Sequence, residues 1–339
     1  MLMRWDAFYY EAIATDGYPS HLPVDAQGEV IQNVWAFFPA FPLGATGVAA
    51  VTGLDFETAA WVLNLGLGAV AAVALACLTR AVTSDDIARR TVVFWSFFPT
   101  AFVLQVPYSE AAYAAVTGAF LLALCSGRFS WASVLLLAAG LTRGSIAPLS
   151  LAALVAVARQ LLETRRPAST PALARLAALS ASAVLAPVLW IATAATVTGR
   201  ADAYIVTQRA WGYEPDAWLW VARWPDALSG VGTDWITTVS VGALAATATL
   251  AIASVRLALP LTLRAYTLAA TALLFAMAMP GAVAFGSVPR FAFGVLTLPI
   301  VLALLVRHRL AVHGLVVAFL AMQYWWVLNV WSGRLGVPP

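Results

Sequence analysis

The scarcity of charge constrains this chain more than any other feature. Hydrophobic residues make up 62% of its 339 residues, and only 10% of the residues are charged. A typical soluble domain carries about 25% charged residues. The deficit excludes an ordinary soluble fold and predicts a polytopic membrane protein. Fourteen tryptophans and eighteen prolines fit this class, because tryptophan marks bilayer interfaces and proline is tolerated in membrane helices.

Ten apolar segments divide the chain. They cover approximately residues 58–80, 91–106, 111–126, 131–141, 145–162, 176–198, 237–255, 265–283, 292–306 and 314–331. Several are shorter than the roughly 20 residues of a straight span, and short or broken helices are tolerated where they line a cavity. We therefore predict one all-α membrane domain over residues 1–339 with about ten spans. No internal repeat or separable soluble domain is evident.

Arginine sorts the intervening turns into two alternating sets. One set holds twelve arginines against three acids: Arg80, Arg89, Arg90, Arg128, Arg159, Arg165, Arg166, Arg175, Arg256, Arg264, Arg307 and Arg309, with Asp85, Asp86 and Glu163. The other set holds the seven remaining arginines and thirteen acids. The positive-inside rule places the first set in the cytoplasm. We therefore expect residues 1–56 and 199–236 to form two external loops.

Segment 34–53 is apolar enough to be taken for a further span. Counting it as one would invert every later turn and place the basic turns outside. Pro39 and Pro42 interrupt the segment, so we expect it to be interfacial or re-entrant. Alanine is abundant and every basic residue is arginine, which indicates a G+C-rich coding bias. The expected location is a bacterial plasma membrane.

Signals for metal or nucleotide binding are missing from the sequence. Cys77 and Cys125 lie inside apolar segments, where small buried side chains are expected, and the three histidines are not grouped as metal ligands. There is no Walker lysine, no glycine-rich βα turn and no Asp-x-Asp pair. We expect no metal, no cofactor and no nucleic-acid partner.

Ionisable groups near a membrane are costly and therefore suggest function. The first group of interest is Arg4, Trp5 and Asp6, followed by Tyr9, Tyr10 and Glu11. On a helix, Asp6 and Tyr10 share a face. A carboxylate beside aromatic rings suits a general base in a sugar-binding pocket, because rings stack on sugars while the carboxylate accepts a hydroxyl proton. The alternative is an interfacial aromatic belt with solvated charges.

Four further groups fall on the same predicted external side. They are Tyr108, Ser109 and Glu110; Arg143; Gln208 and Trp211; and Arg290. Glu110 can bind substrate or only cap a helix. Arg143 and Arg290 suit phosphate recognition, with snorkelling or interfacial anchoring as the alternatives. For Gln208 and Trp211, the alternative to substrate binding is an exposed loop with a salt bridge. Together, two arginines and one or two carboxylates suit an anionic lipid-linked substrate.

The order of these motifs resembles the PIG-V family. The matching segments are RWDAFYYEAIATDGYP, WAFFPAFPL, FFPTAFVLQVPYSEAAY, GLTRGS, QRAW and SVPRF, spread over roughly residues 4–300. This family comprises proteins similar to GPI mannosyltransferase II, which belong to the GT-C class of membrane glycosyltransferases. The resemblance implies a GT-C-type helix bundle, with an essential acid in the first external loop and a cavity at the outer face.

The resemblance also implies roles for particular residues. Asp6 matches the acid of the family's Trp-Asp motif and becomes the candidate base. Tyr108, Ser109 and Glu110 match its Pro-Tyr-Ser-Glu motif, Arg143 its Thr-Arg motif, and Arg290 its Pro-Arg-[Phe/Tyr] motif. Two departures stand out: Tyr9 occupies a position where the family usually has histidine, and the family usually has a membrane helix before Arg-Trp-Asp. We expect such a helix to be missing from this sequence.

The predicted activity is an inverting mannosyl transfer. Mannose would move from a polyprenyl-phosphate carrier to a hydroxyl of a lipid or glycan acceptor at the non-cytoplasmic face, with membrane lipids as the surroundings. The sugar and its carrier rest on the resemblance. A transporter or flippase of an anionic lipid-linked sugar is the alternative class, and a non-catalytic partner subunit is a third reading. The gathering of polar groups on one side and the lack of repeats favour the enzyme.

Overall fold

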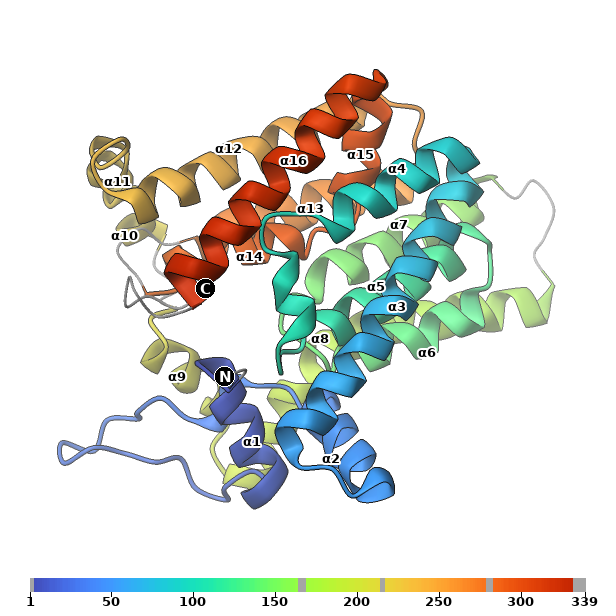
Figure 1. The fold of residues 1–339 in the computed structure, drawn as a ribbon. Helices are drawn as coiled ribbons and strands as arrows, with labels where there is room; N and C mark the ends of the chain where they lie inside the picture. The colour runs from blue at the N-terminus through green and yellow to red at the C-terminus, as the bar shows by residue number, and fades with distance from the viewer. Residues whose placement is uncertain (1–2, 164–168, 214–216, 279–282, 332–339) are drawn as a thin grey trace.

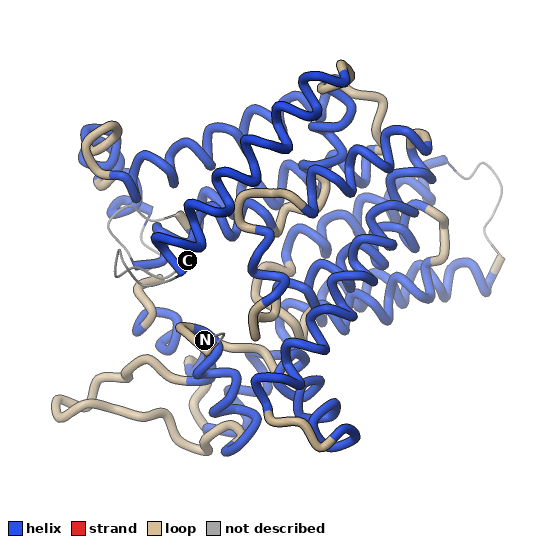
Figure 2. Tube along the Cα trace, in the orientation of Figure 1, coloured by secondary structure: helices blue, strands red, loops and turns tan. Residues whose placement is uncertain are grey.

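The fold is all-α, as predicted. The computed structural model describes residues 3–163, 169–213, 217–278 and 283–331. Within these residues every regular element is helical, and the one isolated β-bridge joins Val24 and Val30. Figure 2 shows helices linked by loops over this part of the chain.

In the part of the chain that the structure describes, four helices are long and apolar enough to cross a membrane. They are α3 (Phe56–Val82), α8 (Thr170–Thr198), α12 (Trp235–Arg256) and α16 (Arg309–Trp326), which continues as a π-helical turn (Val327–Trp331). A fifth candidate span is the bent pair Phe285–Phe293 and Leu298–Leu305, whose two parts meet at 69° and contain α14 (Val288–Phe293) and α15 (Leu298–Leu305). These helices support an integral membrane protein.

Shorter helices complete the bundle. They are α1 (Asp6–Asp16), α2 (Ala40–Thr52), α4 (Asp85–Ser96), α5 (Glu110–Cys125), α6 (Phe129–Ala139), α7 (Ala147–Glu163), α9 (Ala203–Ala210), α10 (Ala217–Ala222), α11 (Trp224–Ser229) and α13 (Leu261–Met277). Every one of the ten predicted apolar segments contains a helix. Because several are short, the count of about ten spans stays a prediction. Segment 34–53 forms a 3₁₀ turn and the 13-residue α2, which is shorter than a span requires.

Small residues allow the helices to approach closely. A Cβ atom added to Gly118 of α5 would lie 3.0 Å from the Cβ of Ala74 on α3. A Cβ atom on Gly140, which follows α6, would lie 2.6 Å from the carbonyl oxygen of Ala186 on α8. Van der Waals contact between small residues is a main source of helix association in membranes. These contacts fix the part of the bundle that carries α5.

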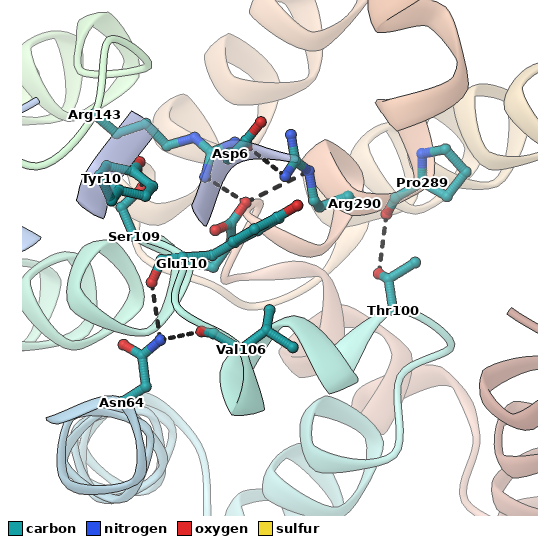
Figure 3. A network of polar contacts seen from close by, with 11 residues as sticks. Asp6, Tyr10, Asn64, Thr100, Val106, Ser109, Glu110, Arg143, Pro289 and Arg290 are labelled. Carbon is teal, nitrogen blue, oxygen red and sulfur yellow. Dashed lines mark hydrogen bonds and ion pairs between the residues drawn. The ribbon is translucent and has the colours of Figure 1, made fainter. Parts of the chain in front are cut away.

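Asn64 of α3 shapes the turn before α5. Its buried side-chain amide donates a hydrogen bond to the carbonyl oxygen of Tyr108 at 3.0 Å and a second to that of Val106. Thr100 joins the same region to α14, because its hydroxyl donates to the carbonyl oxygen of Pro289 at 3.2 Å. Figure 3 shows the hydrogen bonds of Asn64 below Glu110 and the hydrogen bond of Thr100 to Pro289 farther to the right, beyond Arg290. The turn is therefore held by protein groups from two sides.

The two predicted sets of turns lie at opposite ends of the bundle. In Figure 1, α1 and α2 lie at the bottom, α9 lies above α1 at the left, and α10 and α11 lie farther up the left side. The α3–α4 and α15–α16 turns, which carry basic residues, lie at the upper right. Helices from the two loops predicted to be external therefore lie on the same side of the molecule, as a common site requires.

Candidate functional site

Asp6 begins α1 directly after an unusual turn. Trp5, which precedes it, has φ 52° and ψ −117°, and it is the single non-glycine residue with positive φ in the described part of the chain. This region of backbone space suits glycine, and a larger residue held there stores about 1–3 kcal/mol of strain. The surrounding contacts must therefore impose the turn that presents the Asp6 carboxylate.

Arg290 of α14 is the partner of Asp6. Its Nη1 atom donates to Asp6 Oδ2 at 2.8 Å, although 284 positions separate the two residues. Arg290 is only 6% exposed. Its guanidinium carbon lies 5.1 Å from the ring centroid of Tyr108, within the range of a cation–π contact. A buried cation is thus placed against the candidate base.

Glu110 extends this pair into a chain of alternating charges. It is buried at the start of α5, and its Oε1 atom lies 2.7 Å from Nη1 of Arg143 and 3.6 Å from Nε of Arg290. Figure 3 shows Asp6, Arg290, Glu110 and Arg143 converging from four parts of the sequence. With two cations and two anions, this group of four side chains has no net charge, which lowers the free-energy cost of burying it inside the bundle.

Electrostatics keep Arg143 charged. Burial alone would lower the pKa of the Arg143 guanidinium, but the neighbouring Glu110 carboxylate outweighs burial, so the pKa is raised above its ordinary value. For Tyr10, burial and then the charge of Asp6 raise the pKa of the phenol well above its ordinary range. The Tyr10 hydroxyl is therefore a neutral donor, and it donates to Ser109 Oγ at 2.8 Å.

An aromatic group lies one turn along α1 from Asp6. Tyr9 stacks on Phe37, with ring centroids 4.8 Å apart and planes 10° apart. Trp211, just after α9, meets both rings edge-on at 4.9 and 5.3 Å. Tyr9 and Trp211 remain partly exposed. Residues from the two predicted external loops therefore form one aromatic surface.

These groups surround a cavity of about 460 Å³. Its lining includes the predicted site residues Trp5, Asp6, Tyr9, Tyr10, Ser109, Arg143, Gln208, Trp211 and Arg290. Four predicted residues lie outside this lining: Arg4, Glu11, Tyr108 and Glu110. Arg4 donates to the carbonyl oxygen of Trp331 at 3.1 Å, and the Tyr108 hydroxyl donates to the carbonyl oxygen of Arg4 at 3.3 Å. Those two residues secure the turn before Asp6, while Glu11 lies farther along α1.

A smaller cavity of about 60 Å³ adjoins the first. The two share Arg143, Ser145, Met277, Arg290 and Phe291 in their linings. The smaller one is otherwise mainly apolar, with side chains from α5, α7, α13 and α14, and Glu110 lines it as well. The arginines therefore lie at the boundary between the larger cavity, which mixes polar and aromatic groups, and the smaller, mainly apolar one.

Several lining residues were not predicted. They are Gln32, Phe37, Phe38, Tyr204 and Tyr213. Phe37 and Phe38 belong to the segment WAFFPAFPL, whose dense aromatics were a usable signal. Asn64 was also absent from the predicted site residues, although a side-chain amide inside an apolar segment is a recognisable signal. Gln32, Tyr204 and Tyr213 carry no pattern that distinguishes them in the sequence.

The carboxylates of the cavity are paired with guanidinium groups rather than with one another. Among residues the structure describes, no three His, Cys, Asp or Glu side chains gather as metal ligands would. Asp6 and Glu110 each have arginine as their close ionic partner. The arrangement places guanidinium donors and the Asp6 carboxylate in one cavity.

Comparison with known proteins gave a match among solved structures. No family model matches the chain, and no curated protein matches it. Among solved structures, the fold is similar to the crystal structure of the Archaeoglobus fulgidus oligosaccharyltransferase, with 15% sequence identity and a TM-score of 0.41. The match covers 93% of this chain and 48% of that one, so the chain spans about half the length of that protein.

Proposed function

We propose that this protein is an inverting glycosyltransferase of the GT-C class. It moves mannose from a polyprenyl-phosphate carrier to a hydroxyl of a lipid or glycan acceptor on the non-cytoplasmic side of the membrane. The observation that carries the proposal is the convergence of Asp6, Arg290 and Arg143 on one cavity at the end opposite the basic turns. The choice of mannose and of its carrier comes from the PIG-V resemblance.

Asp6 supplies the base in this reaction. The acceptor hydroxyl oxygen forms a bond to the anomeric carbon, and the bond from that carbon to the phosphate oxygen breaks on the opposite face. Asp6 takes the hydroxyl proton, and the polyprenyl phosphate leaves with the bonding electron pair. A positioned base of this type typically contributes about 10²–10⁴ in rate. The single displacement inverts the configuration of the sugar.

The arginines stabilise the departing phosphate. Arg290 has five N–H groups, so it can hold Asp6 and bind a phosphate oxygen at the same time. Fixed donors aimed at developing negative charge are worth about 3–4 kcal/mol each in known enzymes. Because this charge is already supplied by guanidinium groups, we propose that transfer needs no metal ion.

The larger cavity suits the sugar and the acceptor, and the smaller cavity suits the prenyl chain of the donor. Tyr9, Phe37 and Trp211 provide ring surface on which a sugar can stack, with the Gln208 amide nearby in the same lining. On the other side of the arginines, Leu273 and Leu274 provide apolar surface for the first carbons of a prenyl chain. With the donor bound in this way, we expect the bond that breaks to lie next to Asp6.

The test is transfer by purified protein from polyprenyl-phosphate-mannose to total membrane lipids. Asp6→Asn is expected to reduce transfer by at least about 10²-fold, because asparagine cannot accept the proton. Asp16→Asn, an exposed change at the far end of α1, is the matched control and should leave the rate unchanged. Transfer by Asp6→Asn at the wild-type rate would refute the base. Lipid movement across vesicles without any transfer would support a flippase instead.

A further inference from the structure

Arg143 and Arg290 share two neighbours. Both guanidinium carbons lie near the ring of Phe291, at 5.3 Å for Arg143 and 5.2 Å for Arg290 from its centroid. Both side chains also approach the same oxygen, Oε1 of Glu110, at 2.7 and 3.6 Å. Two cations that would repel each other are thus held together by one ring and one carboxylate oxygen.

We propose that Glu110 and Phe291 are positioning residues that hold the two arginines as a clamp for one phosphate group. This inference rests on the proposed function and extends it to two residues that touch the arginines. Glu110 offsets the repulsion between the guanidinium groups, and Phe291 fixes their planes by cation–π contact. The ligand class is a phosphate ester that carries an apolar chain.

Burial explains why the clamp needs this support. The side chains of Arg290 and Glu110 are 7% and 6% exposed, and that of Arg143 is 22% exposed. In such surroundings charges interact more strongly than in water, so two unsupported guanidinium groups would separate. Guanidinium groups recognise phosphate by paired, directional hydrogen bonds, so a shift of either group weakens binding.

The position of the clamp identifies the apolar part of the ligand. Arg143, Arg290 and Phe291 line the larger cavity and the smaller apolar one. A phosphate between the arginines would have the larger cavity, with its polar and aromatic groups, on one side and Leu273 and Leu274 on the other. Inorganic phosphate would contact only the two arginines of the clamp, whereas a prenyl phosphate would contact both the clamp and the smaller, apolar cavity.

The experiment measures binding without any transfer. The probes are farnesyl phosphate, uncharged farnesol and inorganic phosphate, titrated calorimetrically into detergent-solubilised protein. We expect farnesyl phosphate to bind most tightly, inorganic phosphate weakly, and farnesol without saturation. Phe291→Leu keeps every charge and should weaken farnesyl phosphate binding at least fivefold. Phe319→Leu, which changes a partly exposed ring on α16 against Phe94 and Phe98, is the matched control.

A second variant tests the Glu110 carboxylate. Glu110→Gln should weaken farnesyl phosphate binding at least tenfold.

Kinetics separate a positioning role from a folding role. In turnover, Phe291→Leu should raise the donor KM while leaving the acceptor KM unchanged. Equal affinities of Phe291→Leu and Phe319→Leu would overturn the clamp, as would equal changes in both KM values. If wild-type protein binds farnesyl phosphate in a Phe291-dependent manner but transfers no sugar, the clamp stands and the glycosyltransferase proposal fails.

Discussion

Arg290 connects three parts of the site at the scale of single residues. It donates to Asp6, lies 3.6 Å from Glu110 and covers the ring of Tyr108. Lysine could meet one of these partners but not all three, because its ammonium is a point charge without a planar face or a fork of donors. The choice of arginine here is therefore specific to the arrangement.

Arg290→Lys is expected to lower the rate of sugar transfer by at least about 100-fold, the loss typical of removing one oriented donor to developing charge. The measurement is kcat at saturating donor, with thermal unfolding to verify the fold. Arg209→Lys changes an exposed arginine of α9 outside the main cavity and should keep the wild-type rate. Donor use by Arg290→Lys within a factor of three of wild type would remove its phosphate role.

Residue types and their order could be predicted from the sequence, but their partners could not. The motif around Asp6 and the motif around Arg290 were both recognised as site segments, and the structure brings them into contact. No local pattern shows that residues 284 positions apart will form an ion pair. The same holds for Phe291, whose contact with two arginines depends on how α14 lies against the α6–α7 turn.

Helices of this chain are defined by hydropathy, but their ends and breaks depend on packing. Each predicted apolar segment contains a helix because a run of apolar residues is the dominant signal inside a membrane. The 69° bend between the two halves of the α14–α15 pair was not predicted, and it places Arg290 at the cavity. Asn64 likewise holds the turn before α5 through bonds that only the folded chain shows.

Gly140 tests the packing of α6 against α8. Gly140→Ala should destabilise the protein by about 1–3 kcal/mol, because the added Cβ would lie 2.6 Å from a backbone oxygen, which cannot move as a side chain can. The measurement is the midpoint of thermal unfolding in detergent, followed by tryptophan fluorescence.

Gly68→Ala serves as the matched control for this prediction. Gly68 lies inside α3, and no heavy atom comes within 4 Å of a Cβ built there. Alanine is the better helix former, so this change should be neutral or stabilising by up to about 1 kcal/mol. An unfolding midpoint for Gly140→Ala equal to that of Gly68→Ala would contradict the close approach of α6 and α8.

At the scale of the whole molecule, the α3–α4 and α15–α16 turns and the cavity lie on opposite sides of the described part of the chain. Basic turns lie at one end, and α1, α2 and α9 lie at the other with the cavity (Figure 1). The arginine counts sort the turns in the same way, and the positive-inside rule predicts that the basic end faces the cytoplasm. The shape of the cavity could not be predicted in the same way, since it depends on contacts between loops that are far apart in the sequence.

The sidedness of the molecule is testable with single cysteines. In a background with Cys77→Ala and Cys125→Ala, we expect Gln27→Cys to react with a membrane-impermeant maleimide on intact cells. Arg256→Cys, at the end of α12, should react only after the cells are permeabilised. Both positions are exposed, so a difference in labelling reports which side of the membrane they face. Labelling of Arg256→Cys on intact cells, with Gln27→Cys protected until the cells are permeabilised, would contradict an external cavity, and donor and acceptor would then have to meet at the cytoplasmic face.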